Sequence, residues 1–322
     1  MLYRCLKIMA RLALLIFCRK LVINKPSILQ SKGPLLLACN HPNSFLDAVL
    51  LDVLFEQPVW SLARGDAFKG KLVSRILSSL KILPVYRTSE GVENLAENYK
   101  TFDACIQLFK QNGIILIFSE GKCINEWHLR PLKKGTARLA IKAWEENISL
   151  RVLPVGINYS SFKRFGKNII LNFGEVISKG DINFREGDGI KNQAFNNILQ
   201  QQLAQLVLEI PKKDKEKQSA LLEIKPSLLQ KVLLSIPAAI GWLVPMPLFW
   251  PIKKIIWEKT LDNDHYDSIM TGILLLVYPL YLLLIVSILW IFTGNSWVLS
   301  LLLFLPFTAW SYAQLKPQLD ND

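Results

Sequence analysis

Short apolar runs alternate with segments of helical spacing between residues 31 and 210. The runs 35–39 and 114–118 contain no charged residue, whereas 94–112 places its apolar residues three and four positions apart. Strands that are apolar throughout are typical of a sheet whose two faces are covered by helices. The pattern therefore predicts an α/β domain with a central, mostly parallel sheet flanked by helices. The predicted strands are 35–39, 59–63, 82–86, 114–118, 151–158 and 169–173, and the predicted helices are 47–55, 71–80, 94–112, 134–146 and 193–208.

The pattern changes after residue 231. Residues 268–315 carry no charge and are long enough for two membrane-spanning helices, with a turn at residues 293–296. Residues 232–252 are also uncharged, but they contain four prolines and have lysines on both flanks. Positive flanks prefer the cytoplasmic side of a membrane. We therefore expect 232–252 to be re-entrant or interfacial, and only the hairpin 268–315 to cross.

The first residues of the chain combine basic and apolar positions. Arg4, Lys7 and Arg11 precede the apolar run 12–18, which is too short to span a bilayer. We expect an amphipathic helix in the membrane interface, with its basic side chains reaching lipid phosphates; the alternative is the first helix of a soluble fold. The predicted organisation is an interface region at 1–30, the α/β domain at 31–210, a charged linker at 211–230 and the membrane region at 231–322.

The chain is basic. Its 38 lysines and arginines exceed its 26 aspartates and glutamates, for a net charge of +12. Such an excess suits nucleic acid, an anionic membrane surface or an anionic substrate. The sequence has no zinc-finger spacing and no RNA-binding signature, whereas its C-terminal part is apolar. We therefore expect the lipid bilayer as a partner, and no nucleic acid.

The five cysteines form no C-x-x-C pair. An odd number without paired spacing argues against a disulfide framework and against structural zinc. Cys123, Asn125 and His128 also lack zinc spacing, and the acidic cluster at 262–267 is expected to be a loop with helix caps in preference to a cation site. The sequence predicts no metal, and it favours a membrane protein whose α/β domain faces the reducing cytoplasm.

The candidate chemistry begins directly after the first predicted strand, where His41 is followed six positions later by Asp47. Imidazole is the natural general base near neutral pH, and a carboxylate can fix its tautomer and stabilise the imidazolium that forms. The ends of parallel strands line the clefts of α/β sheets. Taken alone, however, a histidine and an aspartate at this spacing are more often a structural pair than a catalytic one.

Three further strands end in polar, glycine or proline residues. Arg87 follows the strand at 82–86, the segment 119–122 (SEGK) follows the strand at 114–118, and residues 152–156 (VLPVG) form another strand end. Each alone is compatible with an ordinary surface loop. Four such ends in this order predict a shared site at one edge of the sheet.

This order resembles the glycerolipid acyltransferase family, which includes glycerol-3-phosphate and lysophosphatidic acid acyltransferases. The family has a His…Asp motif, a strand that leads to arginine, a Phe-Pro-Glu-Gly motif and an apolar motif with proline. The matching positions here are His41…Asp47, Tyr86-Arg87, Phe118-Ser119-Glu120-Gly121 and 152–156. The resemblance covers about residues 30–210. It implies the family's glycerol-3-phosphate acyltransferase-like α/β fold, with 31–210 as the catalytic domain of an O-acyltransferase.

The resemblance implies transfer of a fatty acyl group from a thioester, either acyl-CoA or an acyl carrier protein, to a glycerophosphate hydroxyl in phospholipid synthesis. The expected acceptor is glycerol-3-phosphate or 1-acylglycerol-3-phosphate. Dihydroxyacetone phosphate or another lysolipid is an alternative acceptor, and a non-enzymatic membrane scaffold is the alternative from another class. No cofactor is expected beyond the thioester co-substrate.

The chain departs from the family pattern at two positions. Five residues lie between His41 and Asp47, where most members have four, and Ser119 replaces the proline of the third motif. The longer spacing resembles fungal-type glycerol-3-phosphate and dihydroxyacetone-phosphate acyltransferases, which favours glycerol-3-phosphate. Neither spacing puts the pair on one helix face, so we expect it to lie across a loop-to-helix junction.

The family mechanism implies that His41 takes the proton of the acceptor hydroxyl while Asp47 holds its tautomer. Ser44 lies between them, but the G-x-S-x-G elbow of serine hydrolases is absent. We therefore expect direct transfer without an acyl-enzyme.

The acceptor phosphate requires cationic donors. Arg87 is the first candidate, because a guanidinium can bind phosphate through two hydrogen bonds. Lys122 and Lys133 are the second candidates. Glu120 is expected to order the acceptor or these cations, and a structural ion pair is its alternative role. Gly121 permits close approach of the backbone, and Pro154 is expected to shape the wall of the site. The expected substrate-binding residues are Arg87, Glu120, Gly121, Lys122, Lys133 and Pro154.

Overall fold

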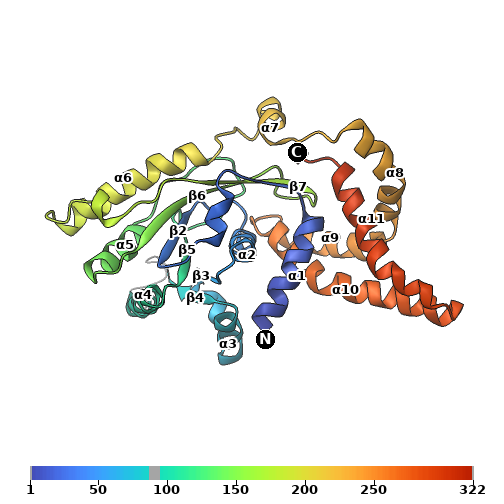
Figure 1. Cartoon of the computed structure of the whole chain (residues 1–322), viewed down its shortest axis with the longest axis horizontal. Coiled ribbons are helices and arrows are strands. Elements are labelled where there is room, and N and C mark those ends of the chain that lie inside the picture. Colours follow the sequence, from blue (N-terminus) through green and yellow to red (C-terminus); the bar gives the residue numbers. More distant parts are fainter. Residues whose placement is uncertain (1, 87–94, 321–322) are drawn as a thin grey trace.

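A computed structural model describes residues 2–86 and 95–320 (Figure 1). Its centre is a seven-stranded sheet with the strand order β1-β7-β6-β2-β5-β3-β4. All neighbouring strands run parallel except β6 and β7. The strands are β1 (Cys18–Ile23), β2 (Leu35–Cys39), β3 (Val59–Arg64), β4 (Ile82–Val85), β5 (Ile114–Phe118), β6 (Arg151–Tyr159) and β7 (Lys167–Phe173). The predicted α/β fold with a mostly parallel sheet is confirmed.

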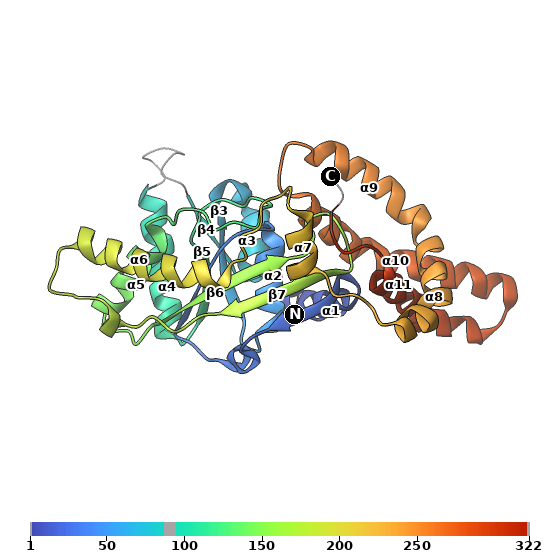
Figure 2. The same cartoon turned by 90° about the horizontal axis from the view of Figure 1, so that it is seen from above.

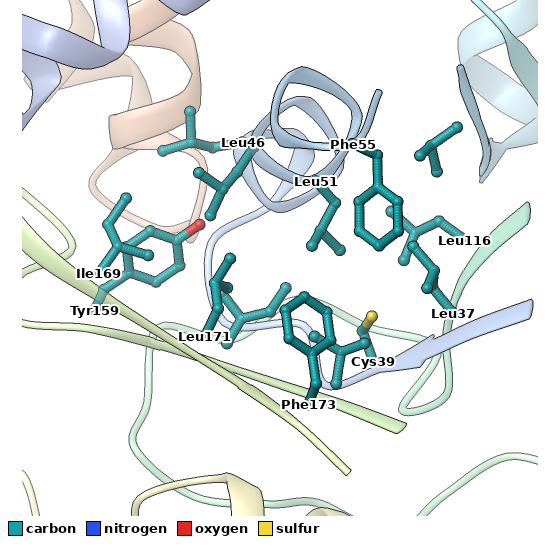
Figure 3. Packing of buried hydrophobic residues seen from close by; sticks show 14 of the residues in the cluster. Leu37, Cys39, Leu46, Leu51, Phe55, Leu116, Tyr159, Ile169, Leu171 and Phe173 are labelled. Atoms are coloured by element: carbon teal, nitrogen blue, oxygen red, sulfur yellow. The ribbon is translucent and has the colours of Figure 1, made fainter. Parts of the chain in front are cut away.

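Helices cover both faces of this sheet. In β2, Leu37 and Cys39 belong to the core beneath α2, whereas Leu36 and Ala38 belong to the core beneath α4, α5 and α6. Figure 3 shows side chains of α2 packed against the first of these cores. Because neither face meets water, β2 has no polar position to alternate with its apolar ones. The helices of the α/β domain are α2 (Phe45–Leu54), α3 (Lys71–Ser79), α4 (Leu95–Lys110), α5 (Gly135–Glu145) and α6 (Asp188–Leu206).

The edge strand β1 was not predicted. It pairs in parallel with β7, so the α/β sheet begins before residue 31. The region 1–30 also contains the helix α1 (Leu2–Phe17) and a short 3-10 helix, Pro26–Gln30. Arg19 and Lys20 interrupt the apolar run in β1, and a strand this short with one solvent-facing edge has little periodicity to detect.

Two basic residues of α1 contact the protein itself, and the lipid contacts expected for this helix stay a prediction. Lys7 donates to the carbonyl of Phe55 at 3.0 Å, and Arg11 donates to the carbonyl of Val53 at 2.9 Å. Val53 lies in the last turn of α2, where a helix has unpaired acceptors and the negative end of its dipole, and Phe55 is the residue after this helix. The two side chains therefore bind the end of α2, while Leu12 and Leu15 form an exposed apolar face on α1.

Four further helices follow α7 (Lys215–Leu222), which lies within the predicted linker: α8 (Leu228–Leu243), α9 (Met246–Thr260), α10 (Tyr266–Thr293) and α11 (Leu301–Leu315). Figures 1 and 2 show them together at one end of the molecule, away from α5 and α6. Two helical stretches, Tyr266–Thr293 and Ser296–Leu315, are long and apolar enough to cross a membrane. The prediction of two C-terminal helices that are apolar enough to span a membrane is confirmed. The pair α8–α9 meets the same criterion only when taken together, and it is bent by 63°.

Both ends of the α8–α9 pair are hydrogen-bonded to other parts of the protein. Before α8, the Ile224 N–H donates to Gln318 Oε1 at 2.8 Å, next to the end of α11. After α9, His265 Nδ1 lies 2.7 Å from Ser44 Oγ, at the start of α2. Pro245 lies at the break between the two helices, where the missing N–H favours an interruption. The re-entrant or interfacial arrangement of 232–252 stays a prediction.

A labelling experiment tests this topology. In a Cys5→Ser background, we expect Lys225→Cys and Asp262→Cys to be labelled in sealed vesicles from the same side as Arg185→Cys in the α/β domain. Asn295→Cys, at the turn of the hairpin, should be labelled from the opposite side. Labelling of positions 225 and 262 from opposite sides would instead mean that α8 and α9 form one bent span.

Candidate active site

His41 leaves the sheet at the end of its central strand. Cys39, the last residue of β2, pairs with Phe118 of β5 and Val155 of β6. Beyond it, the side chain of Asn40 replaces the backbone pairing: its Nδ2 donates to the Ile157 carbonyl at 3.0 Å, and its Oδ1 accepts from the Ile157 N–H at 2.8 Å. These two bonds fix the direction in which the chain enters the next loop, so His41 lies at the edge where the carboxyl ends of β2 and β5 meet.

The His41 ring is held on two sides. Its Nδ1 lies 2.9 Å from Asp47 Oδ2, and its plane stacks on the Phe118 ring with centroids 3.7 Å apart. The His41 side chain is 17% exposed, whereas that of Asp47 is fully buried. When Nδ1 carries the proton and donates a hydrogen bond to Asp47, Nε2 has a free lone pair. The site therefore contains an oriented imidazole whose second nitrogen can accept a proton.

Asp47 lies in the first turn of α2, and His41 lies in the loop before it, as the spacing of the motif predicted. The Asp47 carboxylate accepts two more hydrogen bonds, one from the Asn43 N–H and one from the Tyr159 hydroxyl, both at 2.8 Å. Figure 3 shows the Tyr159 hydroxyl directed toward the start of α2. Burial and the neighbouring Asp47 raise the pKa of Tyr159 well above its usual value, so the hydroxyl remains a donor.

Glu120 connects the His41 loop to the segment that follows β5. It is 4% exposed, and its Oε2 accepts from the His41 N–H at 2.8 Å and from the Arg130 guanidinium at 3.0 Å. Its Oε1 accepts from the Arg130 N–H at 2.8 Å. Arg130 also donates to the carbonyl of Lys122. Of the two roles considered for Glu120, these contacts support the structural ion pair.

Arg130 is a residue that sequence analysis did not select. A buried carboxylate requires a nearby cation or several N–H donors. Glu120 follows an apolar strand, so its burial could have been anticipated from the sequence. The choice between Arg130, Lys122 and Lys133 as its partner could not, because it depends on how the loop after β5 folds back.

The other predicted residues differ in position. Gly121 has φ +70° and forms a turn in which its N–H donates to the Phe118 carbonyl at 3.1 Å. A Cβ at this glycine would lie 3.1 Å from Lys133 Cγ, so the stem of Lys133 passes directly beside the turn. Lys122 and Lys133 are exposed, which leaves them accessible to a solvent-borne anion. Arg87 lies outside the described residues.

The structure does not bring Pro154 to His41. Pro154 pairs with Ala38 inside the sheet. A Cβ at Gly174 would lie 3.3 Å from Pro154 Cβ and 3.1 Å from Leu206 Cδ1 of α6, so Pro154 lies on the face that α6 covers. His41 contacts Asp47 and therefore faces the α2 side. Pro154 is buried in the sheet and does not form the wall of this site, because the side chains of successive strand residues point to opposite faces.

One comparison with known proteins covers the motif residues of this site. Residues 20–158 match the family model described as Acyltransferase, a range that contains His41, Asp47 and Glu120. Comparison with curated proteins gives no match. Among solved structures, the chain is similar to the 1-acyl-sn-glycerophosphate (LPA) acyltransferase PlsC from Thermotoga maritima, with a TM-score of 0.44, 14% identity, and coverage of 63% of this chain and 79% of that one. The part of the chain that carries the motif residues around His41 therefore matches the Acyltransferase family model.

Proposed function

We propose that this enzyme transfers a fatty acyl group from an acyl thioester to the hydroxyl of glycerol-3-phosphate or 1-acylglycerol-3-phosphate, as a step of phospholipid synthesis. The observation that carries the proposal is the pairing of His41 Nδ1 with the buried Asp47 at 2.9 Å, which leaves Nε2 as a proton acceptor. This is the arrangement that a general base requires when the nucleophile is a substrate hydroxyl.

In this mechanism, His41 Nε2 takes the proton of the acceptor hydroxyl as its oxygen attacks the thioester carbonyl. The carbon–sulfur bond then breaks, and the thiolate leaves and takes the proton from the imidazolium. Asp47 stabilises the imidazolium between these two steps. The products are an ester and a free thiol, and the protein returns to its initial protonation state.

Direct transfer agrees with the surroundings of the potential nucleophiles. Ser44 Oγ lies 2.7 Å from His265 Nδ1 and is not hydrogen-bonded to His41. Cys39 and Cys123 are buried near Asp47, and burial raises the pKa of both thiols, which disfavours the thiolate that would have to attack. Hydroxylamine treatment after mixing with donor alone should therefore release no acyl group from the protein.

Exposed basic residues near the motif loops support an anionic acceptor. Lys122 and Lys133 flank the turn at Gly121, and we assign them, together with Arg87, to the acceptor phosphate. The apolar C-terminal helices support a location in the membrane with the α/β domain on the cytoplasmic side. A site next to such helices shortens the path of a lipid product into the bilayer.

The test is an acyl-transfer assay in membranes that contain the enzyme, with radiolabelled palmitoyl-CoA and either glycerol-3-phosphate or 1-acylglycerol-3-phosphate. We expect labelled lipid with at least one of these acceptors. Parallel reactions use dihydroxyacetone phosphate, other lysolipids and an acyl carrier protein donor. Product with only one of these other acceptors would replace the proposed acceptor. No transfer in any combination by folded protein would refute the proposed function.

A further inference from the structure

The loop between His41 and Asp47 is also bonded to the first turn of α10, the first helix of the predicted membrane hairpin. Asn43 Nδ2 donates to Asp267 Oδ2 at 2.6 Å, while the Asn43 backbone N–H donates to Asp47 Oδ2 at 2.8 Å. Asn43 thus connects the carboxylate that orients His41 to a carboxylate of the hairpin. The acidic cluster at 262–267 was expected to provide helix caps, but Asp267 is buried beside the candidate site.

Two neighbouring residues bind the same loop. Ser268 Oγ donates to the Asn43 carbonyl at 3.0 Å and accepts from the Leu46 N–H at 3.2 Å. His265 Nδ1 lies 2.7 Å from Ser44 Oγ. Burial lowers the pKa of His265, which favours the neutral ring that can accept the Ser44 hydroxyl proton. Three residues of the loop are therefore held by the start of α10.

The counterion of Asp267 is Lys167, the first residue of β7. The side chains are 3% and 0% exposed, respectively, and Lys167 Nζ lies 4.8 Å from the centre of the Phe17 ring. Transfer of two charges into such surroundings is costly, and apolar residues of similar size often give equal or greater stability. Stability alone therefore does not explain the ion pair. A requirement to hold the Asn43 side chain at a fixed position does explain it.

The loop needs such support because its backbone is strained. Ser44 has φ 54° and ψ −145°, a conformation that residues other than glycine adopt only when their surroundings impose it. Its N–H donates to Cys123 Sγ at 2.9 Å, and that thiol lies 3.9 Å from the Asp264 carbonyl. This turn at Ser44 is where the chain enters α2, so the placement of Asp47 next to His41 depends on contacts from the hairpin.

We propose that Asp267, paired with Lys167, is a positioning residue for acyl transfer: the start of the membrane hairpin holds the His41–Asp47 loop in its reactive conformation through Asn43. The inference rests on the proposed function, because it concerns the same base. It makes the hairpin a component of the active site as well as an anchor.

The test uses the full-length enzyme with Lys167 and Asp267 replaced together, as Lys167→Met/Asp267→Leu. This variant removes both buried charges at nearly constant volume but leaves Asn43 Nδ2 without its acceptor. We expect kcat to fall roughly 10- to 100-fold, the effect of a misplacement of about 1 Å, with little change in KM for either substrate. The acid limb of the kcat profile should move to lower pH, because a displaced Asp47 stabilises the His41 imidazolium less.

Controls separate positioning from loss of folded protein. The exposed Asp262→Asn, from the same acidic cluster, should match the wild type in kcat, pH profile and melting temperature. A variant that merely loses folded enzyme would show a lower apparent kcat with an unchanged acid limb. A double variant with the kcat and pH profile of the wild type would overturn the inference. If His41→Ala were inactive in the same assay, the proposed function would still stand. Full activity of His41→Ala would overturn the proposed function itself.

A milder variant keeps the proposal testable if the double variant does not fold. Ser268→Ala removes only the hydrogen bonds to Asn43 and Leu46 and leaves the ion pair in place. We expect a smaller loss of kcat, about 3- to 10-fold for one misaligned loop, with the same direction of the pH shift. An unchanged kcat and pH profile in folded Ser268→Ala would overturn the role of the hairpin.

Discussion

Replacement of His41 by alanine is expected to lower the rate of acyl transfer by about 10²- to 10⁴-fold, the usual contribution of a general base. The ring is only 17% exposed, and it contacts Asp47 and Phe118 without being part of the hydrophobic core. The fold should therefore be retained. The measurement is the transfer of labelled acyl groups from thioester to acceptor by the purified variant, with melting temperature measured in parallel.

The chain contains a matched control. His128 also forms a short contact with a carboxylate, with its Nδ1 2.6 Å from Glu209 Oε2, but both side chains are more than half exposed. His128→Ala should change the rate by no more than about twofold, as expected for an exposed pair away from the chemistry. Equal losses in both variants would mean that the effect is not specific to His41, and an active His41→Ala would exclude His41 as the base.

The second large effect is expected for Asp47→Asn. The amide has nearly the same shape, and its oxygen can still accept from the Asn43 N–H, while the Tyr159 hydroxyl can turn to accept from the amide nitrogen. The same oxygen position, Oδ2, also contacts His41 Nδ1, so the main loss is the negative charge that stabilises the imidazolium. By analogy with the aspartate of serine-protease triads, we expect kcat to fall by roughly 10³- to 10⁴-fold, with a small effect on KM. Steady-state kinetics with both substrates measures this.

Tyr159→Phe distinguishes the charge of Asp47 from its hydrogen bonds. It removes one donor to the carboxylate but leaves the charge and the His41 contact in place. We expect a loss of about 1 kcal/mol of stability and a rate within about tenfold of wild type. If Asp47→Asn lost no more activity than Tyr159→Phe, the carboxylate would serve only to hold the loop.

The motif residues Glu120 and His41 are linked by a hydrogen bond from the His41 backbone to the Glu120 side chain. Glu120 accepts from the His41 N–H and forms an ion pair with Arg130. A loop that leaves the sheet at β2 and another that leaves it at β5 are therefore fixed relative to each other by one buried carboxylate. This explains how a motif can require an acid that need not touch the substrate: it sets the position of the base.

The sequence by itself determined the α/β class, most strands of the sheet, the apolar C-terminal helices and the motif residues His41, Asp47 and Glu120. These features are local. A strand covered on both faces is apolar at every position, and a helix in lipid is apolar over its full length. The motif residues were recognised because they follow such strands in a characteristic order. The edge strand β1 was not predicted, because its charged residues and single packed edge produce no regular pattern.

Only the tertiary structure decided which residues surround these motifs. Arg130 as the partner of Glu120, Tyr159 as a donor to Asp47, and Asp267 as the partner of Asn43 come from segments 10, 112 and 224 positions away from the groups they bind. It also moved Pro154 out of the site, because its place in the β6 register turns it to the α6 face. Contacts between distant segments depend on register, loop path and the packing of the hairpin against α2, and none of these leaves a repeating signal along the chain.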